Sequence, residues 1–268
     1  MSFRRRPEST AGFSRCSGFD TPAPASSVDP GLRRGDVYFS GKDMIISPGP
    51  LNLLICYLIG SIPFGLILTK IFLKTDIRAI GSGNIGATNV LRTGSKALAM
   101  ATLLLDGSKG ALAIFLMMLL NPGFYYSLSP QPYSIDGVEY HYFASYCGLL
   151  AVMGHCRPIW LKFKGGKGVA TSLGVYLVSV PYAGLLACGT WLLVAFSFKY
   201  SSLAALVAVA VAPALAFFVY DTKTAIVCSI IALLVWTAHA QNIKRLLNGT
   251  EPKIGSGRNK TADEGPAA

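Results

Sequence analysis

The chain has 268 residues, of which 52% are hydrophobic and only 14% are charged, and its formal net charge is +11. A soluble globular domain carries roughly 25% charged residues, so this composition, together with several long apolar runs, predicts an all-α, polytopic integral membrane protein. The excess of Lys and Arg is then expected at one membrane surface, and no nucleic-acid partner is expected because aromatic residues are not interleaved with the basic ones.

The N-terminal stretch, residues 1–43, differs from the rest of the chain. It is rich in Ser, Pro, Gly and Arg and has no periodic apolar pattern, so we expect a disordered extension. No apolar core of a signal peptide follows its arginines. Met44 opens the apolar part of the chain, and we expect translation from Met44 to give an active protein. Residues 44–255 are predicted to form the membrane domain, and residues 256–268 a disordered tail.

About seven transmembrane helices are predicted in the membrane domain. The apolar run 169–198 is too long for one span and has Pro181 near its middle, so it is interpreted as two passes that meet at this proline. The first of these passes is short, so its helix is expected to begin inside the preceding glycine-rich loop. The other predicted spans are residues 51–73, 97–120, 142–153, 202–220 and 224–240.

The distribution of basic residues predicts the orientation in the membrane. With the loop 74–96 inside, the outer loops after Met44, including 121–141, carry only Lys223. This bias places the N-terminus outside and the C-terminus in the cytoplasm. Three segments that combine glycine with Lys or Arg then share the cytoplasmic face, and they are residues 81–96, 154–171 and 239–255.

The sequence FKGGKGVATSL, residues 163–173, is the strongest candidate for a binding loop. It places Lys164 and Lys167 among Gly165, Gly166 and Gly168. Glycines allow backbone N–H groups to approach a ligand, lysines add positive charge, and a following helix contributes the positive end of its dipole. These features suit a phosphate group at a membrane surface. The alternative is a basic loop that only orients a span.

The segment after the first span contains GSGNIG at residues 81–86, which matches the GxGxxG pattern. No strand precedes it, so a dinucleotide site is not expected. Its polar side chains are either hydrogen-bonding partners of an anion or polyol, or turn and capping residues. Arg92 offers a planar fork for phosphate, or it reaches the membrane interface without a ligand. The polar residues in question are Ser82, Asn84, Thr88 and Asn89.

Asp106 and Lys109 lie three residues apart in an otherwise apolar predicted helix. Charges in such a place must pair or line a polar cavity, so they form either the floor of a site or a structural ion pair. His155 and His239 each begin a predicted cytoplasmic segment, where acid–base chemistry and an ordinary interfacial role are both open. Because Trp160 is the fifth residue after His155, the His-x4-Asp pattern of one acyltransferase class is absent. No cluster of metal ligands is visible, and no metal or other cofactor is expected.

Six stretches together resemble one known family. The chain is similar to the bacterial membrane acyl-phosphate:glycerol-3-phosphate acyltransferases of the PlsY type over about residues 44–255. The stretches are GSIPFG (60–65), DIRAIGSGNIGATNVLRTGSK (76–96), LLDGSKG (104–110), GHCRPIWLKFKGGKGVATSLG (154–174), KYSSLAAL (199–206) and HAQNIKRLLNGTEPKIG (239–255).

The resemblance implies a reaction and a place for it. A fatty acyl group would pass from acyl phosphate to the sn-1 hydroxyl of glycerol 3-phosphate, giving lysophosphatidic acid and inorganic phosphate, with no acyl-CoA or acyl carrier protein. The site would lie on the cytoplasmic side of a seven-helix protein in the bacterial inner membrane. Implied partners are the two substrates, the lipid bilayer and the soluble enzyme that makes acyl phosphate.

The resemblance also carries over substrate contacts, although Ala238 and Ala240 stand where the family usually has basic residues. The expected catalytic residues are His239, Asn242 and Lys167. The expected substrate-binding residues are Ser82, Asn84, Thr88, Asn89, Arg92, Lys109, His155, Lys164, Gly165, Gly166, Ser201 and Ser202. The alternative function is a transporter or channel for an organic phosphate. A scaffold protein would explain neither the glycine loops nor Asp106 and Lys109.

Overall fold

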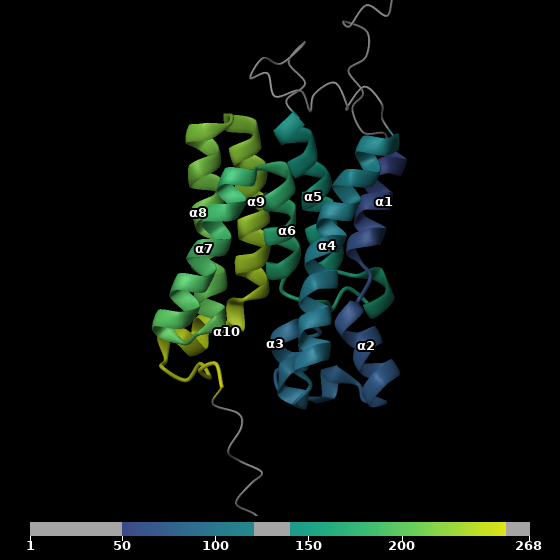
Figure 1. The fold of residues 1–268 in the computed structure, drawn as a ribbon, viewed down its shortest axis with the longest axis vertical. Coiled ribbons are helices and arrows are strands. Elements are labelled where there is room, and N and C mark those ends of the chain that lie inside the picture. Colours follow the sequence, from purple (N-terminus) through teal and green to yellow (C-terminus); the bar gives the residue numbers. More distant parts are fainter. Residues whose placement is uncertain (1–49, 121–139, 256–268) are drawn as a thin grey trace, which may run out of the picture. The chain divides into compact units, whose positions relative to one another are not determined.

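A computed structural model describes residues 50–120 and 140–255, and every regular element in these two stretches is helical. The described residues belong to one compact unit (Figure 1). The predictions for residues 1–43, the loop around residue 130 and the tail 256–268 lie outside the described residues. The helices are α1 (Pro50–Gly60), α2 (Phe64–Leu73), α3 (Ala87–Val90), α4 (Lys96–Leu120), α5 (Tyr140–Cys156), α6 (Val169–Ser179), α7 (Pro181–Phe198), α8 (Ser201–Val219), α9 (Thr222–Ala238) and α10 (Ala240–Leu247).

Each apolar segment expected from the sequence coincides with helix. The first is divided into α1 and α2 at Pro63, which lacks the N–H that a continuous helix needs. The predicted division at Pro181 is confirmed, because α6 ends at Ser179 and α7 begins with this proline. Helix α6 begins at Val169, directly after Gly168, and its 11 residues make it an apolar helix shorter than those long enough to cross a membrane.

Several helices are long and apolar enough to cross a membrane. They are α1 with α2, α4, α7 and α8, and α9 joins them if α10, bent away by 66°, is counted as its continuation. Large apolar side chains cover their outer surfaces, such as Phe196 and Phe218, which are 78% and 82% exposed. Lipid is the solvent in which such a surface is stable. The protein is therefore an integral membrane protein that crosses the bilayer several times.

Helices α5 and α6 lie at the centre of the bundle. Helix α5 packs against α1, α4, α6 and α9, while α6 packs against α4, α5, α7 and α8. Small residues allow this close approach, because a Cβ on Gly60 of α1 would lie 2.0 Å from the carbonyl oxygen of Ala151 in α5. The loop that joins α5 to α6 consequently starts and ends inside the protein.

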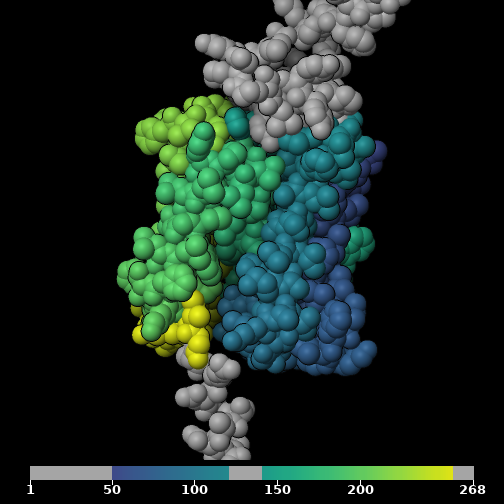
Figure 2. Space-filling model, viewed as in Figure 1, coloured from purple at the N-terminus to yellow at the C-terminus, as the bar shows by residue number. Residues whose placement is uncertain are grey.

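The basic segments of the chain gather at one end of the bundle. Figure 1 shows the end of α2, helix α3 and helix α10 at the lower end, and Figure 2 shows the C-terminal segment, in yellow, at the same end as the blue α2–α3 region. A separate small core of Ile77, Ile85 and Val90, all at most 2% exposed, anchors the segment that follows α2. This anchor holds the GSGNIG turn in place.

We predict that Gly174→Ala lowers the free energy of unfolding by about 1–3 kcal/mol, because overpacking of two helix backbones cannot be relieved by rotating a side chain. The new Cβ would lie 2.1 Å from the carbonyl oxygen of Gly107 in α4. Gly189→Ala in α7 is the matched control, since a Cβ there meets nothing within 4 Å. Unfolding of the purified proteins in detergent measures both changes. Equal stability of the two variants would contradict this account of the packing.

Candidate active site

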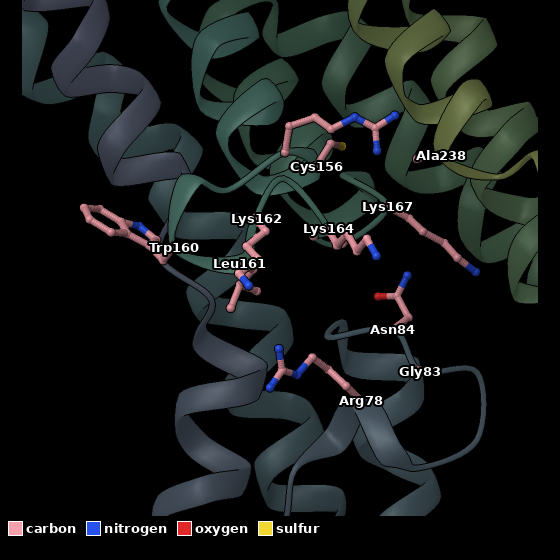
Figure 3. A pocket seen from close by; sticks show the side chains of 13 residues that line it. Arg78, Gly83, Asn84, Cys156, Trp160, Leu161, Lys162, Lys164, Lys167 and Ala238 are labelled. Carbon is pink, nitrogen blue, oxygen red and sulfur yellow. The ribbon is translucent and has the colours of Figure 1, made fainter.

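A cavity of about 640 Å³ lies between the loop that joins α5 to α6 and the segment that follows α2. Figure 3 shows its side chains, with Lys164 and Lys167 reaching from the loop toward Asn84 and with Arg78 on the opposite wall. None of the thirteen lining residues is acidic, and five of them are cations. The cations are Arg78, Arg157, Lys162, Lys164 and Lys167.

The charge of this cavity is only partly balanced by the protein. Arg78 is bound by Asp76, at 2.6 Å between guanidinium and carboxylate, and its hydrogen bonds hold the pKa of that carboxyl well below its usual range. The other four lining cations form no ion pair with a described residue. An arrangement of this kind favours an anionic ligand.

The glycine loop takes its shape from hydrogen bonds to the end of α5. The N–H of Gly166 donates to the carbonyl oxygen of His155 at 3.0 Å, and the N–H of Gly165 donates to that of Cys156 at 3.2 Å. A Cβ on Gly166 would lie 1.9 Å from the ring of His155. The expectation that these two N–H groups face a ligand is therefore wrong, because both are used inside the protein. Gly165 and Gly166 line the cavity, and their role is to let the loop pack against α5.

Lys167 is the partly buried cation of the loop and stands next to the other basic segments. Burial lowers the pKa of Lys167 to about 8. The charges of Arg245 and Arg92 act in the same direction, whereas the carboxylate of Glu251 opposes them. Charges from all three segments that the sequence placed on one membrane face therefore act on Lys167. Lys164, in contrast, is exposed at the cavity wall.

Some polar residues in and after the GSGNIG segment stabilise the turn that follows α2, and others reach the cavity. The buried amide nitrogen of Asn89 donates to the carbonyl oxygens of Ile77, Ile80 and Asn84, and its oxygen accepts from the N–H of Ser82. The structure therefore supports the turn-residue alternative for Asn89, since its amide closes the turn. Asn84 also caps the turn, by accepting from the N–H of Gly86, but its side chain lines the cavity.

The remaining polar residues of this segment are accessible. Ser82, Thr88 and Arg92 are exposed, so they remain free to meet a ligand. Gly81, with a φ of +55°, lets the chain turn beside Arg92, where a Cβ would lie 2.8 Å from the guanidinium. The close approach of Gly81 to Arg92 therefore uses a turn that only glycine adopts easily.

The C-terminal segment contributes a buried cluster around Glu251. Asn242 donates to one carboxylate oxygen at 2.6 Å, and Arg245 donates to the other at 2.7 Å. Burial favours the neutral form of Glu251, but the hydrogen bonds from Asn242 and Arg245 help to keep the pKa of the carboxyl below its ordinary value. Asn242 is therefore oriented by an acidic residue of its own segment, whereas the buried hydroxyl of Ser202 has no hydrogen-bond partner among the described residues. Ser201 is the first residue of α8 and is partly exposed.

His239 lies between α9 and α10 and is buried, at 2% exposure. Its Nδ1 is 2.8 Å from the carbonyl oxygen of Val235. A carbonyl oxygen only accepts, so Nδ1 carries the proton and Nε2 keeps its lone pair. A substrate hydroxyl would find an acceptor at Nε2.

Lys109 and His155 are placed behind the glycine loop and are absent from the cavity wall. Lys109 is 2% exposed and its ammonium lies 2.8 Å from Asp106 and 2.8 Å from Nδ1 of His155. The ion-pair alternative therefore describes the arrangement of Lys109 with Asp106, and the prediction that Lys109 and His155 bind substrate stays a prediction. Arg157 and Lys162 do line the cavity, and both belong to the basic segment 154–171.

Comparisons with known proteins agree with this geometry. The sequence model described as glycerol-3-phosphate acyltransferase matches residues 51–249, which include all three basic segments up to Gly249. A Rhodospirillum rubrum glycerol-3-phosphate acyltransferase is 51% identical over 201 residues, covering 75% of this chain and 88% of the relative. A Paramagnetospirillum magneticum protein of the same name is 47% identical over 209 residues, covering 78% and 94%.

Solved structures show the same similarity in three dimensions. Crystal structures of PlsY (YgiH), an integral membrane glycerol 3-phosphate acyltransferase, superpose with TM-scores of 0.66 for the glycerol 3-phosphate form and 0.64 for the lysophosphatidic acid form. Each is 33% identical and covers 76% of this chain and 94% of the solved chain. The chain therefore belongs to the glycerol-3-phosphate acyltransferase family, and it is an integral membrane acyltransferase.

Proposed function

We propose that this protein transfers a fatty acyl group from acyl phosphate to the sn-1 hydroxyl of glycerol 3-phosphate, producing lysophosphatidic acid and inorganic phosphate. The observation that carries the proposal is the cation-lined cavity, whose Lys167 also lies within electrostatic range of Arg92. Both substrates bear a phosphate, so two anion sites are needed side by side. Lys162, Lys164 and Lys167 line the cavity, and the charge of Arg92 acts on Lys167.

The chemistry of an acyl phosphate fits a site that has few acids and bases. Phosphate is already a good leaving group, so its departure needs little protonation by the protein. Among the residues that line the cavity there is no carboxylate, and His155 is buried behind the loop. Electrostatic stabilisation by fixed cations is then the main contribution that the protein makes.

In the proposed reaction, the sn-1 hydroxyl oxygen attacks the carbonyl carbon of the acyl phosphate. The bond from that carbon to the bridging oxygen breaks, and phosphate leaves with the electron pair. The hydroxyl proton passes to a phosphate oxygen of a substrate. Lys167 and Arg92 stabilise the negative charge, while His239 and Asn242 position the glycerol backbone. The other proposed contacts are Ser82, Thr88, Lys164 and a serine of the pair at the start of α8.

The proposed setting is the bacterial inner membrane, with the site on the cytoplasmic side. The acyl chain of the donor is dissolved in lipid, so a site at the membrane surface meets it directly. Basic residues at the end of the bundle that carries α2, α3 and α10 support this orientation. In this arrangement the seven apolar segments all cross the bilayer, the N-terminus is outside and the C-terminus is cytoplasmic.

The first prediction concerns the acyl donor. Purified protein in detergent is expected to form lysophosphatidic acid from glycerol 3-phosphate and palmitoyl phosphate, and to release inorganic phosphate in equal amount. Palmitoyl-CoA and palmitoyl carrier protein, added at the same concentration, are expected to give no product. Mass spectrometry quantifies the product, and NMR of its glycerol carbons reports the acylated position. Turnover with a thioester alone would show that the donor is assigned wrongly.

The second prediction concerns Lys167. Lys167→Ala is expected to reduce kcat/KM by about ten- to 150-fold, the effect of losing a hydrogen bond to a charged group worth about 1.5–3 kcal/mol. The control is Lys96→Ala, since Lys96 is an exposed lysine at the start of α4. Both variants should insert normally, and equal activity of the two would leave the loop with an orienting role.

The same lysine predicts a pH dependence. Because burial lowers the pKa of Lys167 to about 8, its positive charge is complete well below pH 8 and is lost as the pH rises through this value. Wild-type kcat/KM should therefore fall on the alkaline side of pH 8. Lys167→Arg keeps its charge throughout, so its profile should stay flat there. An identical alkaline fall in both proteins would assign that ionisation to another group.

The third prediction separates positioning from base catalysis at His239. His239→Gln keeps an acceptor near the position of Nε2 but cannot titrate near neutrality. General-base catalysis contributes about 10²–10⁴-fold in rate, so removal of a catalytic base would reduce turnover by a similar factor. We expect the variant to keep appreciable activity, with a pH profile still set by phosphate ionisation at about pH 6–7. Loss of turnover together with one limb of the profile would make His239 the base.

A further inference from the structure

A cluster of three ionisable side chains lies inside the bundle, behind the glycine loop. Asp106 and Lys109 come from α4 and His155 from the end of α5, and they are 3%, 2% and 5% exposed. The ammonium of Lys109 is 2.8 Å from Oδ1 of Asp106, 2.8 Å from Nδ1 of His155 and 2.9 Å from the carbonyl oxygen of Ile62. That carbonyl belongs to the break between α1 and α2.

The geometry around Lys109 determines which protons the cluster holds. An ammonium group has three N–H donors, and here each of them has one acceptor. Nδ1 of His155 must therefore accept, which places the proton of the neutral imidazole on Nε2. The cluster is a carboxylate, an ammonium and a neutral imidazole, with no net charge. A complete set of partners is what a buried charged group requires.

His155 connects this cluster to the glycine loop. Its carbonyl oxygen accepts the N–H of Gly166, and its ring packs against the same glycine, where no Cβ would fit. At the other end of the loop, the hydroxyl of Thr171, in the first turn of α6, donates 2.8 Å to the carbonyl oxygen of Asp106. The residues on both sides of Lys164 and Lys167 are thus held by the segment that contains Asp106 and Lys109.

We propose that Asp106, Lys109 and His155 are positioning residues that set the place of the glycine loop, and thereby the place of Lys164 and Lys167, for catalysis. None of the three lines the cavity, so they act through the loop and do not touch substrate. The inference rests on the proposed function in one respect, namely that the loop lysines bind a phosphate of the substrates. Misplacement of a binding group by about 1 Å costs about 10²-fold in rate, so a small shift of the loop is enough.

Substitutions at His155 test the assigned tautomer. Asn places its side-chain oxygen near the position of Nδ1, so His155→Asn keeps the acceptor for Lys109. Gln reaches the position of Nε2 instead, and Leu keeps only the volume. We expect His155→Asn to retain kcat/KM within about tenfold of wild type, and His155→Leu and His155→Gln to lose about 10²-fold. Ser145→Ala is the control on the same helix, because Ser145 is buried in α5 and is remote in sequence from the loop.

Removal of the ion pair tests the other half of the cluster. Asp106→Leu with Lys109→Met takes away both charges at once, and such a replacement is often neutral or favourable for stability. We expect the unfolding temperature of this double variant to stay close to that of wild type while kcat/KM falls by about 10²-fold. If the double variant does not fold, the His155 series alone decides the question.

A binding measurement separates this inference from the identity of the acyl donor. Calorimetry with glycerol 3-phosphate and no acyl donor is expected to show weaker binding to the double variant and to His155→Leu, but not to His155→Asn or Ser145→Ala. A failure to use acyl phosphate would leave this comparison intact. The inference is overturned if a folded double variant binds and turns over like wild type. It is also overturned if His155→Gln is active and His155→Asn is not, since His155 would then act through Nε2.

Discussion

Polar groups inside a helical membrane protein must find partners within the protein, and this constraint accounts for the form of the site. Among the described residues, the chain leaves regular helix at residues 61–63 and again in the loop after α5. The carbonyl oxygen of Ile62, freed by the first break, accepts from Lys109, and the amides of Gly165 and Gly166 bond to the end of α5. The hydrogen bonds that give these backbone groups their partners are therefore the same contacts that fix the position of the loop.

Because these backbone amides are used inside the protein, the surface proposed to bind phosphate consists mainly of side chains. In many phosphate-binding loops, backbone N–H groups face the anion. In this protein the two glycine amides are already used, so the positive charge comes from lysine and arginine side chains supported by a stiff loop. The depressed pKa of Lys167 shows that its environment disfavours a lone cation. A phosphate beside it would favour the charged form, so ligand binding and protonation of Lys167 would support one another.

Glu251 supplies negative charge near Lys167, in contrast to the lysine and arginine side chains of the cavity. It is a buried carboxylate that receives hydrogen bonds from Asn242 and Arg245, and it balances part of the charge around Lys167. It orients Asn242 on α10, next to His239 at the bend from α9. The site thus combines free cations on one side with a polar cluster of fixed geometry on the other. An acyl donor whose phosphate is already a good leaving group needs little acid or base catalysis from the protein.

Composition and local pattern were sufficient for the class of protein, the helical segments, the break at Pro181 and the segments that supply the site. These follow from hydropathy, from the missing N–H of proline and from charge bias, all of which act over short stretches of chain. The sequence did not distinguish ligand-binding polar groups from structural ones. Asn89, Lys109 and His155 have side chains that could bind a phosphate. In the structure, however, Asn89 donates to the carbonyl oxygen of Ile77, and Lys109 contacts the carbonyl oxygen of Ile62 and the ring of His155. Only the tertiary structure decided this, because a hydrogen bond depends on which distant segments come within about 3 Å of one another.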